Sequence, residues 1–279
     1  MNLGEVLTSA TQRLTAAGVG SPRVDAELMA ADLFGMERRD LVLHLADQID
    51  EVGAADYDAM VVRREHREPV QYILGTAPFR HLLLDVGLGV FIPRPETELL
   101  VDVIVPFAQQ LPAPLVVDLC SGSGALAFAV DDEVPAATVI AVETDVAALH
   151  WLRRNALETD VEVVEGDVAD STVLSGLDGT VDVVVSNPPY VPDGTPVSDE
   201  VRADPAVAVF AGPDGLRLIP AVITCAARLL RPGGLFVMEH DDTQGEAVPA
   251  LLQAAGDWTM IADHLDLTGR PRYVVAVRA

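Results

Sequence analysis

Leu115-Val116-Val117-Asp118-Leu119-Cys120-Ser121-Gly122-Ser123-Gly124-Ala125-Leu126-Ala127 is the stretch that decides the fold. An apolar run of strand length is followed by a turn of small residues and then by the start of an apolar helix. Small residues let the backbone approach a ligand closely, and the N–H groups of a helix N-terminus point into the same space. On its own, the pattern is shared by many tight strand-to-helix turns. It nevertheless predicts a ligand-binding loop made of Cys120, Ser121, Gly122, Ser123 and Gly124.

Two further strands are predicted downstream, and each leads to residues suited to an adenosine-type ligand. Thr138–Val142 ends at Glu143, whose carboxylate can hold the two hydroxyls of a ribose. Val161–Val164 leads to Asp167, which can meet an adenine amino group, and to Val168, which can cover the ring. Because the carboxyl ends of parallel strands meet at one crevice, we expect these residues to line a single site.

Asn187-Pro188-Pro189-Tyr190 follows a fourth predicted strand, Val181–Ser186. Neither proline has an N–H, each fixes its own φ, and the residue before a proline is pushed out of the helical region. The Asn187 amide and the Pro188 carbonyl are therefore held in one orientation at the edge of the sheet. Two such acceptors suit both hydrogens of a planar NH2 group. A rigid turn without a chemical role is the alternative interpretation of this stretch.

The organisation of the chain is predicted to be bipartite. Residues 1–70 show apolar residues at three- and four-residue steps without strand alternation, which predicts a small helical bundle. Its role is either to dock a partner or to cap and stabilise the rest. Residues 71–94 predict a β-hairpin linker. Over residues 95–279, strands alternate with helices, which predicts an α/β domain with a largely parallel sheet.

The C-terminal part contains the last predicted elements. Arg231-Pro232-Gly233-Gly234 is interpreted as a turn before a strand at Leu235–Glu239. Two final strands are predicted over residues 259–262 and 273–277. His240 is interpreted as a structural residue at a strand end and not as a base.

The charge of the chain bears on its partners. The formal net charge is −25, and all 18 basic residues are arginine. A nucleic-acid-binding protein normally presents a cationic surface to phosphates, so no direct nucleic-acid partner is expected, although a local basic patch remains open. The densest basic group, Arg63, Arg64 and Arg67, lies on a predicted helix with Glu65 and Glu68. That mixture favours a solvated helical face over a nucleic-acid patch.

Length and cysteine usage indicate the setting. At 279 residues there is room for one large and one small domain. No apolar run reaches the roughly 20 residues that cross a membrane, so no membrane partner is expected. The two cysteines, Cys120 and Cys225, lie far apart in sequence. We therefore expect no disulfide framework, no metal site and a cytoplasmic location. We also expect a monomer.

Nearly the whole chain resembles the HemK/PrmC family of release-factor glutamine methyltransferases, within the Rossmann-like methyltransferases that use S-adenosylmethionine. NPPY alone also occurs in DNA adenine and RNA guanine methyltransferases. Its combination with the Phe91–Glu98 segment and a helical N-terminal region is more selective. The other segments that carry the resemblance are Arg67–Gly75, Asp118–Gly124, Pro213–Leu216, Arg231–Gly234 and Glu239-His240.

The chain departs from the family pattern at three places. Cys120 and Ser121 stand where the family usually has Gly and Thr, and Glu143 stands where Asp is common. The segment from Glu200 to Pro205 lacks the aromatic residue or His seen in many relatives. The last departure puts details of substrate contact in doubt and leaves the reaction unaffected.

The resemblance implies an enzyme that methylates the side-chain nitrogen (N5) of the Gln in the Gly-Gly-Gln motif of peptide-chain release factors. Its cofactor is S-adenosylmethionine and its fold is a Rossmann-like methyltransferase sheet with a small N-terminal helical domain. Two rivals remain: an N-methyltransferase acting on adenine or guanine in DNA or RNA, and a non-enzymatic module that binds an adenosine ligand. The implied catalytic residues are Asn187, Pro188 and Tyr190, and the substrate-binding residues are Asn187, Pro188, Pro189 and Tyr190. The implied cofactor-binding residues are Cys120, Ser121, Gly122, Ser123, Gly124, Glu143, Asp167, Val168 and Asn187.

Overall fold

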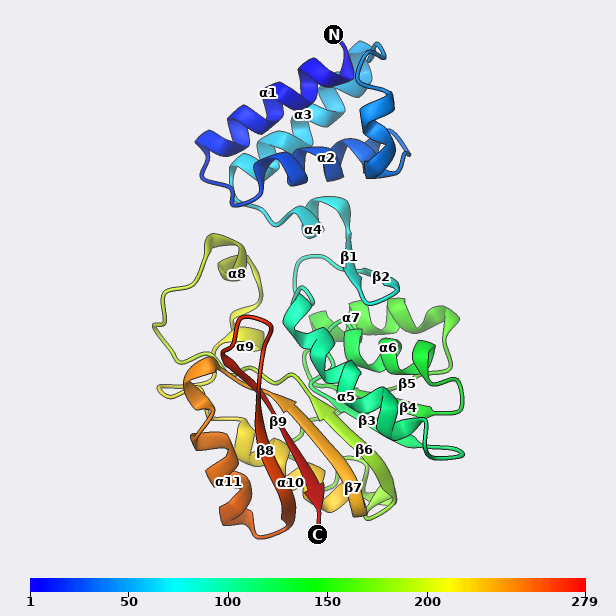
Figure 1. Ribbon diagram of the computed structural model, residues 1–279, viewed down its shortest axis with the longest axis vertical. Coiled ribbons are helices and arrows are strands. Elements are labelled where there is room, and N and C mark those ends of the chain that lie inside the picture. Colours follow the sequence, from blue (N-terminus) through cyan, green and yellow to red (C-terminus); the bar gives the residue numbers. More distant parts are fainter. The chain divides into compact units, whose positions relative to one another are not determined.

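The computed structural model describes all residues from 1 to 279 and divides into two compact units (Figure 1). Unit 1 consists of Met1–Thr76 together with Ser198–Ala203. Unit 2 consists of Ala77–Val197 and Asp204–Ala279. The chain therefore leaves unit 2 shortly after NPPY, contributes a short segment to unit 1, and returns.

Unit 1 is helical. Pro22 stands at the first position of its helix, where its missing N–H costs nothing. Asn2 and Glu5 form a reciprocal capping box at the start of the first helix. The core is apolar and includes the fully buried Leu7 and Met29. The helices are α1 (Leu3–Ala16), α2 (Pro22–Leu33), the 3-10 helix η1 (Arg38–Leu43), α3 (Glu51–Glu65), α4 (Val70–Leu74) and α8 (Asp199–Ala203).

The cluster of Arg63, Arg64 and Arg67, at the C-terminal end of α3, is not wholly solvated as expected. Arg64 is 4% exposed and donates to Asp25 at 2.8 Å and to Glu200 at 2.8 Å. Arg67 donates to the same Glu200, and the two hydrogen-bonded arginines lower the pKa of Glu200 to about 2 against the opposing effect of its desolvation. The prediction of a solvated face is wrong for Arg64, because acidic partners distant in sequence neutralise it in the interior of unit 1.

Unit 2 is built on a seven-stranded sheet with the order β5-β4-β3-β6-β7-β9-β8. The first five strands in this order run parallel, and β9 and β8 are antiparallel. The sheet strands are β3 (Leu115–Leu119), β4 (Thr138–Glu143), β5 (Glu162–Glu165), β6 (Val181–Ser186), β7 (Leu230–Glu239), β8 (Trp258–Leu265) and β9 (Pro271–Arg278).

Alternate residues of these strands enter two apolar cores, one on each face of the sheet. Val183 and Val185 of β6 face the core shared with α5, α6 and α7, whereas Val184 faces the core shared with α10 and α11. Figure 1 shows these two sets of helices flanking the strands. The helices are α5 (Glu98–Ala108), α6 (Ala125–Glu133), α7 (Val146–Asn155), α9 (Ala206–Val209), α10 (Ile219–Leu229) and α11 (Ala247–Ala255). The 3-10 helices of unit 2 are η2 (Pro95–Thr97), η3 (Ala156–Glu158), η4 (Ser175–Leu177) and η5 (Asp242–Gln244).

Some predicted boundaries are corrected by the structure. β7 starts earlier than predicted, because Leu230 already pairs with Val181. Residues 231–234 have no partner on β6, Gly233 has φ +78°, and regular pairing resumes at Leu235, where the strand was predicted to begin. The last two strands are longer than predicted. A separate two-stranded sheet, β1 (Thr76–Phe79) and β2 (Leu82–Asp85), lies within the segment for which a hairpin was predicted.

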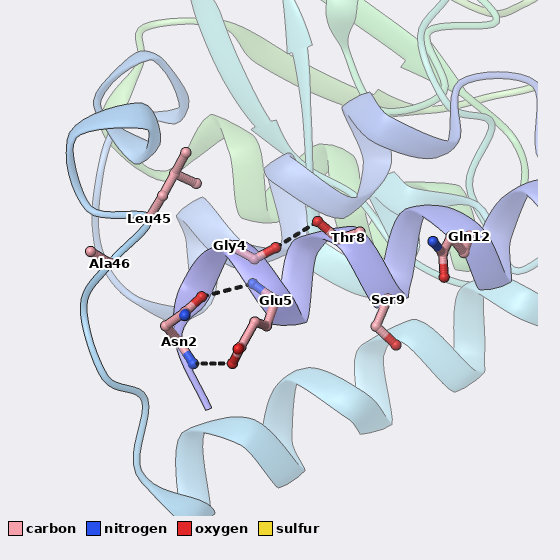
Figure 2. A pocket seen from close by; sticks show the side chains of 8 residues that line it. All are labelled: Asn2, Gly4, Glu5, Thr8, Ser9, Gln12, Leu45 and Ala46. Carbon is pink, nitrogen blue, oxygen red and sulfur yellow. Dashed lines mark hydrogen bonds between the residues drawn. The ribbon is translucent and has the colours of Figure 1, made fainter.

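A shallow surface depression lies along the start of α1 (Figure 2). Its polar groups are used within the helix: Asn2 and Glu5 bond each other's backbone N–H, and Thr8 donates to the Gly4 carbonyl. No candidate site residue lines it; those residues lie at the strand ends of unit 2. Every helix of the chain is too short or too polar to cross a membrane.

Candidate functional site

The loop after β3 has the tight geometry that its small residues predict. Gly124 has φ +88°, and a β-carbon there would lie 2.1 Å from the Phe128 ring. Cys120 has φ +62°, a left-handed conformation that is costly for a residue with a side chain. This position is one of the departures from the family pattern, where Gly is usual. Burial, reinforced by nearby carboxylates, raises the pKa of the Cys120 thiol well above its ordinary value, which leaves no reactive thiolate.

Asp118, at the end of β3, is a buried carboxyl without a hydrogen-bond partner on either oxygen. The Ser121 hydroxyl donates to the backbone carbonyl of Asp118. Desolvation raises the pKa of Asp118 to about 8 and the charge of Glu143 acts in the same direction, while the nearby Ser121 hydroxyl and Ala127 N–H oppose the shift. A buried acid with two unused acceptors beside a glycine-rich loop is suited to a cationic ligand.

Glu143, at the end of β4, ties the loops of the site together. Its Oε2 accepts from the Gly122 N–H at 2.9 Å, and its Oε1 accepts from the N–H groups of Thr144 and Asp145 at 2.7 and 2.8 Å. A carboxylate offers about four acceptor positions. One position on Oε2 is therefore left for a ligand hydroxyl, fewer than the two expected for a ribose.

The loop after β5 leaves Asp167 exposed, whereas Val168 is buried at the edge of the core shared with α10 and α11. One oxygen of Asp167 accepts from the Ala169 N–H at 2.8 Å. The Gly166 N–H donates to the Glu143 carbonyl, which joins this loop to the end of β4. The ends of β3, β4 and β5 thus form one continuous edge of the sheet.

NPPY follows β6 at the same edge. The Asn187 amide nitrogen donates to the Thr97 hydroxyl at 3.0 Å. Its Oδ1 accepts no hydrogen bond, and neither does the neighbouring Pro188 carbonyl. Two adjacent carbonyl oxygens at the strand end therefore have no hydrogen-bond partner within the protein. The hydrogen bond that sets the direction of the Asn187 amide comes from the segment before α5.

Tyr190 is tied to the end of β7. Its hydroxyl donates to Glu239 Oε1 at 2.6 Å, and Thr97 donates to Glu239 Oε2 at 2.7 Å. Desolvation raises the pKa of Glu239 above its ordinary value, and these two hydrogen bonds oppose the shift. The adjacent His240 is fully buried, with one ring nitrogen on the Asp241 carbonyl and the other on Asp263. Both ring nitrogens are occupied, in agreement with a structural role.

The Pro213–Leu216 segment supports NPPY from the other side. Gln244 donates to the carbonyls of Tyr190 and Asp214, both at 3.0 Å. Gly215 has φ +71°, and a β-carbon there would lie 2.0 Å from the Tyr190 carbonyl oxygen. Only glycine fits at this position, because any side chain would collide with the backbone of NPPY.

The predicted site residues therefore lie on consecutive strand ends of one sheet edge. Three residues that the sequence analysis did not assign to the site join them: Asp118, Thr97 and Glu239. Asp118 had a local signal, an acid inside an apolar strand. Thr97 and Glu239 lie in segments that carry the family resemblance, but their hydrogen bonds depend on residues far along the chain and could not be predicted from local sequence.

Both parts of the chain match known proteins. Residues 5–75 match the family model of the PrmC N-terminal domain, and residues 95–203 match the methyltransferase small domain. The chain is 48% identical to the release factor glutamine methyltransferase of Mycolicibacterium smegmatis over 99% of this chain and 98% of that protein. It is 40% identical to the 4-amino-L-phenylalanine/4-methylamino-L-phenylalanine methyltransferase of Streptomyces pristinaespiralis over 92% and 89% of the two chains.

A solved structure supports the fold. The 16S rRNA N2 G1207 methyltransferase of Thermus thermophilus, solved with AdoMet and guanosine, superposes with a TM-score of 0.51 at 21% identity, covering 73% of this chain and 50% of that one. The sheet is thus a Rossmann-like methyltransferase sheet. The match to the methyltransferase small domain and the curated relatives show that the chain is a methyltransferase. Three relatives named release factor glutamine methyltransferase are 46% to 48% identical to the chain over 99% of its length, so the chain belongs to the release factor glutamine methyltransferase family.

Proposed function

We propose that this enzyme transfers a methyl group from S-adenosylmethionine to the side-chain nitrogen of the glutamine in the Gly-Gly-Gln motif of a peptide-chain release factor. The observation that carries the proposal is the free pair of acceptors, Asn187 Oδ1 and the Pro188 carbonyl. A primary carboxamide has two hydrogens on one nitrogen, and this pair can accept both.

The residues around NPPY supply orientation. A carboxamide nitrogen is almost non-basic because its lone pair is delocalised into the carbonyl. Acceptors on Asn187 and Pro188 favour positive charge building on that nitrogen and fix the line of attack. When bound, S-adenosylmethionine supplies an electrophilic methyl group. Glu239 already accepts from Thr97 and Tyr190, so we assign the final proton loss to solvent. The Pro189 ring and the Tyr190 side chain are proposed to contact the flat amide.

The cofactor site is proposed at the ends of β3, β4, β5 and β6. The residues proposed to hold S-adenosylmethionine are Cys120, Ser121, Gly122, Ser123, Gly124, Glu143, Asp167, Val168 and Asn187. The fit rests on Asp118, whose two unpartnered buried oxygens suit a ligand that carries positive charge. The free acceptor position on Glu143 suits one ribose hydroxyl.

A variant of Glu143 tests the cofactor site. Glu143→Ala removes a charged acceptor and loosens the Gly122 loop, and each hydrogen bond to a charged group is worth about 1.5–3 kcal/mol. We expect S-adenosylmethionine affinity, measured by calorimetry, to fall by at least about tenfold. Glu165→Ala, at the end of the neighbouring strand, is the matched control. Unchanged affinity in Glu143→Ala would remove that residue from the site.

Unit 1 is proposed to dock the protein substrate. It has an apolar core of its own, and its family model matches separately from that of the methyltransferase part. A chain starting at Gln71 should bind S-adenosylmethionine yet methylate release factor poorly. This shortened chain also carries Glu200→Ala, because the truncation removes Arg64 and Arg67, the ion-pair partners of Glu200. Full activity of the shortened chain would assign unit 1 to stabilisation instead.

Nucleic acid is the less favoured substrate. Every arginine except Arg217 lies within ion-pair distance of a carboxylate. Arg217 donates to the Phe210 carbonyl. A surface whose cations are already neutralised releases few counterions from a phosphate backbone.

Asn187 variants test the reaction. Asn187→Ala removes one preorganised acceptor, and losses of this kind cost on the order of 10²–10³ in turnover. Asn187→Asp keeps an acceptor and is expected to retain more activity than Ala. The assay is methyl transfer from labelled S-adenosylmethionine to purified release factor, tRNA or DNA in parallel. Wild-type turnover in Asn187→Ala would contradict the assigned role.

A further inference from the structure

We propose that Glu239, acting through Thr97, is a positioning residue that decides which end of the Asn187 carboxamide faces the substrate. The inference rests on the proposed function and concerns how the acceptor on Asn187 is made available. Thr97 lies between the two side chains, 3.0 Å from the Asn187 nitrogen and 2.7 Å from Glu239 Oε2.

The strand register brings these groups together. β6 and β7 pair in parallel with Ser186 opposite Met238. The next residues, Asn187 and Glu239, therefore leave adjacent strands at the same level. Thr97, in the turn just before α5, spans the remaining gap. Neither of the two hydrogen bonds is local in sequence, so the arrangement is a product of the sheet.

The direction of the hydrogen bonds follows from the chemistry of each group. The Thr97 hydroxyl donates to Glu239 Oε2, and a hydroxyl has a single proton to donate. The oxygen of Thr97 is therefore left as an acceptor. The only end of the Asn187 amide that can bond an acceptor is its NH2 group. Oδ1 is then turned outward, where a substrate amide can reach it.

The same carboxylate also holds the last residue of NPPY. Tyr190 donates to Oε1 at 2.6 Å, so both oxygens of Glu239 are engaged. Glu239 is 1% exposed and Thr97 is 3% exposed. A buried charge is costly, and an apolar pair of similar size would fill the space at least as well. We explain the carboxyl group by the direction it gives to the Thr97–Asn187 hydrogen bond, in which Asn187 is the donor.

The proposal predicts that Glu239→Gln can reverse the direction of both hydrogen bonds made by Thr97. In Glu239→Gln, the new amide NH2 group can donate to Thr97, and Thr97 can then donate to Asn187 Oδ1. The substrate would meet an NH2 group where it needs an acceptor. A role confined to stability predicts no such effect, because Gln has nearly the same shape as Glu and keeps a hydrogen bond to Thr97.

The experiment measures kcat on purified release factor, S-adenosylmethionine Kd and thermal stability in Thr97→Val, Thr97→Ser and Glu239→Gln. Thr97→Val keeps the shape but removes the hydrogen bonds, and Thr97→Ser restores them. We expect kcat to fall by about 10- to 100-fold in Thr97→Val and Glu239→Gln. We expect Thr97→Ser to recover to within about threefold of wild type, with Kd within about threefold in all three. Thr224→Val, at an exposed hydroxyl on α10 that donates to the Pro220 carbonyl, is the control.

A second readout separates this inference from the proposed function. In 15N-labelled protein, the Asn187 side-chain NH2 resonances report the hydrogen bond to Thr97 without any substrate. They should shift and exchange faster with solvent in Thr97→Val and Glu239→Gln and stay near wild type in Thr97→Ser. Wild-type resonances in Glu239→Gln, or wild-type kcat in either disabling variant, would overturn the positioning role. Failure of the wild type to methylate release factor would instead refute the proposed function.

Discussion

Asp118→Asn offers a quantitative test of the buried acid at the centre of the site. The carboxyl is 1% exposed, lacks hydrogen-bond partners and has a pKa raised by burial from 3.8 to about 8. The folded state therefore binds a proton more tightly than the unfolded state does. Between about pH 4 and pH 8 the folded protein holds more protons, so its free energy of unfolding falls as the pH rises.

The size of the effect follows from the shift. Each pH unit inside this window costs up to about 1.4 kcal/mol. From pH 5 to pH 8 the wild type should lose about 3–4 kcal/mol through this one group. Asn cannot ionise, so the variant lacks that slope. The difference between the two proteins removes the contributions of the other titrating groups, which both proteins share.

Urea unfolding at pH 5, 6, 7 and 8 without S-adenosylmethionine measures the difference. Both tryptophans, Trp151 and Trp258, lie in unit 2 together with Asp118, so their fluorescence reports the relevant unit. The stability of the variant relative to wild type should rise steadily with pH. Parallel stability curves for the two proteins would refute the assignment of a neutral buried acid.

Cofactor binding provides a second consequence. If positive charge on S-adenosylmethionine pairs with Asp118, binding near pH 7 should ionise the carboxyl and release close to one proton. Calorimetry in buffers of different ionisation enthalpy measures this release, and Asp118→Asn should abolish it. A wild-type proton release in the variant would place the cation elsewhere.

Two further predictions concern the supports of the site and of unit 1. Gly215→Ala should lower turnover by at least about tenfold. Its β-carbon would lie 2.0 Å from the Tyr190 carbonyl oxygen, and a left-handed φ disfavours any side chain. Methyl transfer at the wild-type rate would contradict this prediction. Arg64→Met should destabilise the protein by about 3–5 kcal/mol, because it leaves Asp25 buried without its ion pair; Arg63→Met, at an exposed pair, should change the melting temperature little, and equal effects in the two variants would contradict the distinction.

The sheet and its strand ends were predictable because their signals are local. A buried parallel strand is a short apolar run closed by Gly, Pro or Asn, and Val181–Ser186 is found as β6 with the predicted bounds. The start of β7 was missed for the same reason. The Pro and Gly of Arg231–Gly234 indicate an interruption, which the structure has, but the pairing of Leu230 with Val181 before it is a long-range contact.

Long-range contacts account for what the sequence could not predict. Thr97 and Glu239 are 142 residues apart, and only the sheet register places them beside Asn187. Arg64 was expected on a solvated face because its neighbours on α3 are charged. Its partners, Asp25 and Glu200, are 39 and 136 residues away. Burial of a charged residue depends on such partners and leaves no trace in local periodicity.

The most direct test of the central claim is mass spectrometry of release factor incubated with this enzyme and S-adenosylmethionine. A gain of about 14 Da, one CH2, should appear on the Gly-Gly-Gln peptide, with fragment ions placing it on the glutamine side chain, and its yield should collapse in Asn187→Ala. tRNA, DNA and 4-amino-L-phenylalanine, incubated separately, should stay unmodified. An unmodified Gly-Gly-Gln peptide together with methyl label in nucleic acid or in the free arylamine would contradict the account.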